Sequence, residues 1–144
     1  MIKRLLLALF IAIFTIPAFA RPHPWDLTQA DKTAIRQVIR AQLAAFRKDD
    51  ADLAFSYASP LLQDKFGNAE NFLDMVKTAY PSVYRPRDVQ FRELETTVDG
   101  PVQKVFFFGP DGDPVLGLYL MQKQRNGKWK TNGCELAPAP DRAI

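Results

Sequence analysis

Cysteine and histidine are almost absent from this 144-residue sequence, which contains only Cys134 and His23. A single cysteine excludes an internal disulfide bond, whatever the redox state of the compartment. A single histidine excludes Ser-His-Asp and Cys-His catalysis unless His23 itself takes part. His23 lies between two prolines near the N-terminus, where loosely ordered chain is typical. We interpret Cys134 as a small buried core residue, with an intermolecular disulfide or a reactive thiol as alternatives.

A strong net charge is also lacking. The formal charge is +3, from 19 basic and 16 acidic residues. No stretch interleaves basic with aromatic residues as nucleic-acid-binding proteins do, so we expect no nucleic-acid partner. The cluster Asp49, Asp50 and Asp52 lacks the glycine and the further oxygen ligands of a calcium loop, and we predict that it ends one helix and caps the next. We predict no catalytic residue, no bound metal and no cofactor.

The N-terminus has the features of a cleavable secretory signal. Lys3 and Arg4 precede an apolar stretch over residues 5–16, and the small residues Ala18 and Ala20 follow. This order predicts Sec-type cleavage after Ala20. The stretch is shorter than the about 20 residues that cross a bilayer, although an uncleaved N-terminal anchor is the alternative. We expect a bacterial protein that is periplasmic or secreted, without a membrane span once the signal at residues 1–20 is removed.

Removal of the signal leaves a chain that is long enough for one domain but not for two. We predict an extended arm over residues 21–26, a single domain over 27–136 and a flexible tail over 137–144. The first half of this domain is expected to be helical and the second half to be strands, because the periodicity of the apolar residues changes after residue 86.

Three helices are predicted before that point. Apolar residues at helical spacing indicate a helix over 29–48, with Thr28 and Asp31 as its capping box. A second helix follows the aspartate cluster and is interrupted at Ser59-Pro60, after which a short helical turn continues. A third helix runs over residues 69–79 and ends before Pro81.

Four strands are predicted over residues 88–97, 102–108, 115–124 and 128–136. Asn126-Gly127 between the last two is a strong hairpin signal. The chain is therefore expected to be an α+β domain, with three N-terminal helices packed on a four-stranded antiparallel sheet. The central strands are apolar on both faces, unlike those of a sheet with one face in water. This pattern predicts a homodimer formed through the outer sheet face.

Several segments of the chain together resemble a known family. They include residues 44–50 (AAFRKDD), 55–60 (FSYASP), 83–87 (VYRPR) and 129–134 (WKTNGC). Their order and spacing resemble the nuclear transport factor 2-like superfamily and, more narrowly, DUF4864, an uncharacterised family of small exported bacterial proteins. The resemblance implies a cone-like fold, in which a curved sheet wraps around helices and leaves a pocket at its open end.

The resemblance implies no established activity. The superfamily includes ketosteroid isomerases, polyketide cyclases, dehydratases and pure binding modules. The isomerase pattern needs a tyrosine in the first helix, where this sequence has none, and the dehydratase pattern needs a His-Asp pair, whereas the only histidine lies outside the expected domain. No catalytic residue is carried over.

Residues 84–87, Tyr-Arg-Pro-Arg, form the most distinctive stretch. Two arginines held by a proline are suited to bind a carboxylate or a phosphate, and pairing with surface acids such as Glu93 or Glu95 is the alternative. Trp129 is either a ligand-stacking wall or a plug in the core. The candidate ligand-binding residues are Tyr57, Tyr84, Arg85, Arg87 and Trp129.

The preferred interpretation is a non-enzymatic module that binds a small apolar or anionic molecule, or another protein. One alternative is a small isomerase- or cyclase-type enzyme that uses a pocket Asp or Tyr, and another is a structural partner of an envelope protein. A pocket carboxylate with a strongly raised pKa would favour the enzyme. An apolar cavity of several hundred Å³ would favour ligand binding, and a filled cavity would favour the structural partner.

Overall fold

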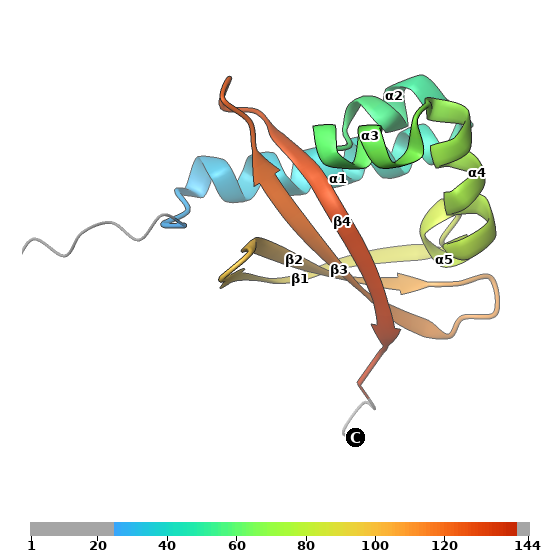
Figure 1. The fold of residues 1–144 in the computed structure, drawn as a ribbon. Coiled ribbons are helices and arrows are strands. Elements are labelled where there is room, and N and C mark those ends of the chain that lie inside the picture. The colour runs from blue at the N-terminus through green and yellow to red at the C-terminus, as the bar shows by residue number, and fades with distance from the viewer. Residues whose placement is uncertain (1–24, 141–144) are drawn as a thin grey trace, which may run out of the picture.

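Helices cover one face of a four-stranded antiparallel sheet in the computed structural model, which describes residues 25–140 (Figure 1). The predicted signal, its cleavage point after Ala20 and His23 lie outside the described residues. The α+β class and the packing of helices on such a sheet are confirmed. None of the described helices combines the length and the apolar character needed to cross a membrane.

The first helix, α1 (Gln29–Arg47), starts at the predicted capping box. The side chain of Thr28 accepts a hydrogen bond from the Asp31 backbone N–H, and the Asp31 carboxylate accepts one from the Thr28 backbone N–H. Each bond satisfies an N–H group that a helix start leaves without a partner. The apolar residues that the helical period places on one face are buried: Ile35, Ile39, Leu43 and Phe46.

Four shorter helices follow: α2 (Ala51–Ser56), α3 (Pro60–Phe66), α4 (Ala69–Ala79) and α5 (Pro81–Tyr84). The side chains of Asp50, Ser59 and Asn68 cap α2, α3 and α4. The interruption at Ser59-Pro60 thus separates two helices. The prediction of three helices missed α5, because Pro81 was interpreted only as a stop. Proline at the first helical position also starts a helix well, since its missing N–H has no intrahelical partner there.

The strands are β1 (Asp88–Thr97), β2 (Gly100–Phe108), β3 (Pro114–Lys123) and β4 (Trp129–Pro138). They pair in chain order, each antiparallel to the next. The predicted bounds agree to within two residues, although β4 extends two residues into the segment expected to be a flexible tail. Gly127 adopts a positive φ of 83° in the β3–β4 turn, as the Asn-Gly signal predicts.

The two faces of the sheet differ in burial. Val105, Phe107, Tyr119 and Met121 point towards the helices and are at most 2% exposed. Most of the residues that alternate with them are apolar but only half-buried: Phe106, Phe108, Leu116, Leu118 and Leu120. Lys104, opposite Leu118, is a charged exception and pairs with Glu95. The helices therefore bury one face, and the apolar pattern of the other face is left without a covering layer in the described chain.

Candidate functional site

A pocket with a volume of about 790 Å³ lies between the helices and the edge strand β4. The segment that joins α2 to α3 binds this edge, because Ser59 N donates to Thr131 O and Thr131 N donates to Tyr57 O, both at 2.8 Å. The following residues of β4, 132–135, line the pocket. Its walls come from six elements and are formed by Gln42, Phe46, Leu61, Leu62, Lys65, Phe66, Phe72, Met75, Val76, Ala79, Tyr80, Val83, Tyr119 and residues 131–135.

Aromatic rings stiffen the helical side of this pocket. Phe72 on α4 lies at the centre, with its ring centroid 5.9 Å from Phe46, 5.6 Å from Phe55 and 5.5 Å from Phe66. All three pairs are tilted, the arrangement that aromatic quadrupoles favour. The pocket wall is therefore a preformed apolar surface.

The polar side chains on the wall are mostly held by the protein itself. The Gln42 amide Nε2 donates to Ala54 O at 3.0 Å and to Thr131 Oγ1 at 3.2 Å. The Ser59 hydroxyl donates to Asn132 Oδ1 at 2.6 Å. These bonds orient the amides and leave few polar atoms for a ligand to satisfy.

Two tyrosines on the wall differ in whether their hydroxyl groups have a hydrogen-bond partner. The Tyr80 hydroxyl donates to the backbone O of Cys134 at 3.2 Å. The Tyr119 hydroxyl is buried and has no hydrogen-bond partner among the described residues. Tyr119 stands directly opposite Cys134 in the β3–β4 register. The thiol of Cys134 is its polar neighbour and interacts with it, but a thiol sulfur is only a weak hydrogen-bond acceptor.

Burial controls the ionisation of this group of residues. It raises the pKa of the Cys134 thiol to about 12. Burial, and next the nearness of Cys134, hold the pKa of Tyr119 well above its ordinary value, and burial also raises the pKa of Tyr80. All three groups therefore stay protonated at neutral pH. A thiol with so high a pKa is a poor nucleophile, which disfavours the reactive-thiol alternative. Cys134 packs against the core as the preferred interpretation expected, but it is only partly buried.

The predicted Tyr-Arg-Pro-Arg stretch lies elsewhere, at the junction of α5 and β1, where it packs against the link between α1 and α2. The Tyr84 hydroxyl donates to the Asp49 carboxylate, and Arg85 Nη2 and Lys77 Nζ lie 3.0 and 3.4 Å from its oxygens. These contacts, with the Tyr84 bond first, lower the pKa of Asp49. Asp49 has a positive φ of 53°, so its pairing with Tyr84 and Arg85 holds an uncommon backbone conformation.

The acid that pairs with Arg85 is thus Asp49, whereas the predicted alternatives were Glu93 and Glu95. Glu95 binds Lys104 instead, at 2.6 Å. Glu93 and Glu95 were predicted because they follow Arg85 closely along the chain. The actual partner is 36 residues upstream and is brought close by the packing of α5 against α1. The backbone N–H of Arg87 donates to Phe108 O at 2.8 Å, where β1 begins.

Tyr57 and Trp129 line a second depression, of about 650 Å³, between α1 and the β3–β4 hairpin. Trp129 is only 4% exposed, and its indole Nε1 donates to Asp31 Oδ1 at 3.0 Å. These contacts favour its interpretation as a core plug. The five candidate residues therefore lie in three places, and none of them lines the 790 Å³ pocket.

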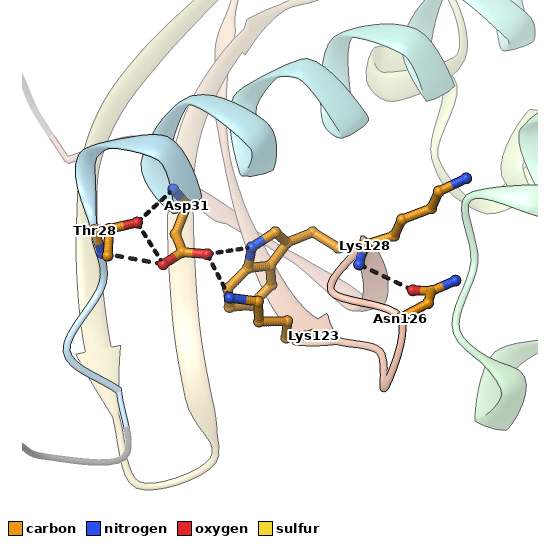
Figure 2. A network of polar contacts seen from close by, with 6 residues as sticks. Thr28, Asp31, Lys123, Asn126 and Lys128 are labelled. Carbon is orange, nitrogen blue, oxygen red and sulfur yellow. Dashed lines mark hydrogen bonds and ion pairs between the residues drawn. The ribbon is translucent and has the colours of Figure 1, made fainter.

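Asp31 joins the start of α1 to the β3–β4 hairpin (Figure 2). Its Oδ2 accepts from the Thr28 hydroxyl and backbone N–H at 2.8 and 3.1 Å. Its Oδ1 accepts from Lys123 Nζ at 2.9 Å as well as from Trp129. One carboxylate, 13% exposed, therefore caps a helix and anchors the hairpin.

Asp31→Asn is expected to lower the free energy of unfolding at neutral pH by about 1–2 kcal/mol, because an amide cannot accept on both atoms. The pKa of Asp31 is lowered by the bonds from Lys123, Thr28 and Trp129. Because the folded-state pKa of this carboxylate lies below its unfolded-state value of about 3.9, its ionised form stabilises the protein at any pH above that value. This contribution to the free energy of unfolding is lost as the pH falls towards the folded-state pKa. In urea unfolding, the gap between parent and variant should therefore be constant near pH 6–7 and shrink below about pH 4.

Asp111→Asn is the control for this measurement, because Asp111 is exposed in the β2–β3 turn. It should leave the free energy of unfolding within about 0.5 kcal/mol of the parent. A gap for Asp31→Asn that grew on acidification would contradict the assigned role of the carboxylate.

No metal centre is indicated within residues 25–140, where no group of three or more His, Cys, Asp or Glu side chains is placed to hold an ion. The pocket residues Gln42, Tyr80 and Tyr119 were not among the predicted site residues. They belong to separate elements, so no spacing along the chain relates them. The one available signal was Tyr119 itself, the single aromatic residue of β3.

Comparison with known proteins gives a family but no activity. Residues 28–144 match DUF4864, which is described as a domain of unknown function. Among solved structures, the chain is similar to an NTF-2-like protein of unknown function from Burkholderia xenovorans LB400. The two are 17% identical, the alignment covers 76% of this chain and 90% of that chain, and the TM-score is 0.45. No curated protein matches the sequence.

Proposed function

The chain belongs to the DUF4864 family, and from this premise we propose that its domain is a non-enzymatic module that binds a small apolar molecule in the 790 Å³ pocket. The observation that carries the proposal is the pocket itself: an open, preformed cavity walled by aromatic and aliphatic side chains. Small-molecule sites have volumes of about 300–1,000 Å³ and few, well-placed polar groups. Both properties fit, and an unfilled cavity argues against a purely structural partner.

The chemistry of the wall favours binding over catalysis. Its one carboxylate is Glu135, which is exposed, and no aspartate lines the pocket. The isomerase- or cyclase-type alternative needs a pocket base with a pKa near the working pH. The wall tyrosines have pKa values shifted upwards, away from neutrality, so they can donate hydrogen bonds but cannot remove protons.

The charges at the pocket make an anionic ligand less suitable than a neutral one. Lys65 and Glu135 are both exposed and have opposite signs, so they leave no net positive field. The arginines expected to hold an anion, Arg85 and Arg87, do not reach this pocket. A ligand that buried a charge there would lose its hydration without a counterion.

The neutral fluorescent probe N-phenyl-1-naphthylamine tests the proposal. Its fluorescence should rise on titration into the mature chain and saturate at one site per domain. Leu62 is half-buried on the pocket wall, so Leu62→Trp should place an indole in the cavity and weaken binding by about tenfold or more.

Leu53→Trp is the matched control, because Leu53 is a 42% exposed leucine on another short helix and does not line the pocket. It should bind the probe like the parent. A parent protein that fails to bind the probe, or a Leu62→Trp variant that binds it unchanged, would refute the proposal.

A second copy of the chain on the outer sheet face is the partner that we propose for this domain. Phe106, Leu116, Leu118 and Leu120 form a half-buried apolar patch on the two central strands. A two-fold dimer brings the same patch of each copy together, and two sheets packed face to face bury such residues. This arrangement would supply the missing cover for the second apolar face.

Export to the periplasm or beyond is the final part of the proposal. It is supported by the order of features within residues 1–20, where basic residues are followed by an apolar stretch and then by small residues. N-terminal sequencing of the protein recovered from a bacterial periplasm should start at Arg21. Recovery of the intact N-terminus would contradict cleavage after Ala20.

A further inference from the structure

The Tyr119 hydroxyl is the one buried side-chain polar atom of residues 25–140 without a hydrogen-bond partner. Tyr119 is 2% exposed and lines the pocket from the sheet side. Its ring is held by Phe107, with a centroid separation of 6.2 Å. A buried donor without a partner destabilises a fold, and such groups are uncommon enough in native proteins that each calls for an explanation.

Tyr80 provides the contrast on the same wall. Its hydroxyl donates to the carbonyl of Cys134 at 3.2 Å, so its hydrogen-bonding capacity is already used. Tyr119 has the same chemical group, deeper in the wall, and the protein does not satisfy it. Of the two tyrosines, therefore, only Tyr119 has a hydroxyl that is still free to donate a hydrogen bond.

We propose that the Tyr119 hydroxyl anchors the ligand by donating a hydrogen bond to a neutral carbonyl oxygen on an otherwise apolar molecule. This inference rests on the proposed binding function of the same pocket. A neutral acceptor fits because the buried end of the pocket has no cation, whereas a carboxylate there would need one.

Access to the hydroxyl requires a small local change. Cys134 faces Tyr119 across the β3–β4 pair and also lines the pocket. Its side chain has a single rotatable bond to the sulfur, so a change between staggered rotamers moves the thiol without moving the backbone. Burial keeps the pKa of Tyr119 well above its ordinary value, so the hydroxyl keeps the proton that it would donate.

Two neutral probes of similar size distinguish this inference from the proposed function. Prodan, 6-propionyl-2-dimethylaminonaphthalene, carries a ketone whose emission moves to longer wavelength when it accepts a hydrogen bond. N-phenyl-1-naphthylamine has no carbonyl. Tyr119→Phe should weaken Prodan binding about tenfold and move its bound emission to shorter wavelength, while N-phenyl-1-naphthylamine affinity stays within about twofold.

The stability of the same variant provides an independent reading. Tyr119→Phe removes a buried hydroxyl that has no partner, so its melting temperature should equal or exceed that of the parent. Tyr84→Phe is the matched control: it removes a hydroxyl that donates to Asp49 and does not line the pocket, so it should lower the melting temperature and leave the Prodan emission unchanged.

The outcomes separate cleanly. Unchanged Prodan affinity and emission in Tyr119→Phe would overturn the anchor and leave the pocket proposal intact. Equal loss of both probes would show a general disturbance of the pocket and would likewise overturn it. Failure of both probes to bind the parent would refute the pocket proposal, and the anchor with it.

Discussion

Phe107→Ala is expected to lower the free energy of unfolding by about 3–5 kcal/mol, the usual cost of removing a fully buried phenylalanine. Phe107 is 0% exposed on the helix-facing surface of the sheet. It packs closely against β3, since a Cβ atom on Gly117 would lie 2.6 Å from the Phe107 ring. The absence of a side chain at position 117 therefore makes room for this ring, and its removal should leave a cavity that the sheet cannot close.

Phe106→Ala is the control for that measurement in urea unfolding. Phe106 is the preceding residue on the same strand, points to the other face and is only half-buried. At protein concentrations where the chain is monomeric, Phe106→Ala should lower the free energy of unfolding by less than about half as much, because less apolar area returns to water. Equal costs for the two variants would show that the helices do not define the main core.

Leu116→Lys is expected to convert the proposed dimer to a monomer, as measured by light scattering at micromolar concentration. Leu116 lies opposite Phe106 on β2 and Ala137 on β4, on the outer face of a central strand. In a two-fold dimer the substitution places two lysines in one apolar interface, where unpaired charges cost several kcal/mol.

Leu53→Lys controls for a general effect of added charge, because Leu53 is 42% exposed on α2 and lies outside the sheet. It should leave the measured mass unchanged. A parent protein with the mass of a single subunit would refute the proposed dimer.

Much of the secondary structure was predictable, because the signals for it are local. The Thr28–Asp31 box starts α1, Asp50 and Asn68 cap later helices, and Gly127 turns the last hairpin. Each of these depends on residues within a few positions of one another. The miss at α5 has the same origin: Pro81 fits both the end of one helix and the start of another, and only packing distinguishes the two.

The candidate site was predicted less well than the fold. Tyr84, Arg85 and Trp129 were conspicuous by residue type, and the structure commits all three to contacts within the protein. Asp31 and Asp49 are the acids that hold them, through separations of 35 to 98 residues. A sequence without a structure offers no means of finding such partners.

Spacing along the chain was enough to indicate the helices other than α5, the four strands, their adjacency and their apolar faces, since backbone hydrogen bonding and side-chain alternation act over short distances. The location of the pocket required the folded arrangement, because its walls come from residues as far apart as Gln42 and Glu135. The same holds for Tyr119. Whether a buried hydroxyl has a partner depends on what packing brings beside it, and here packing brings a thiol, which is only a weak acceptor.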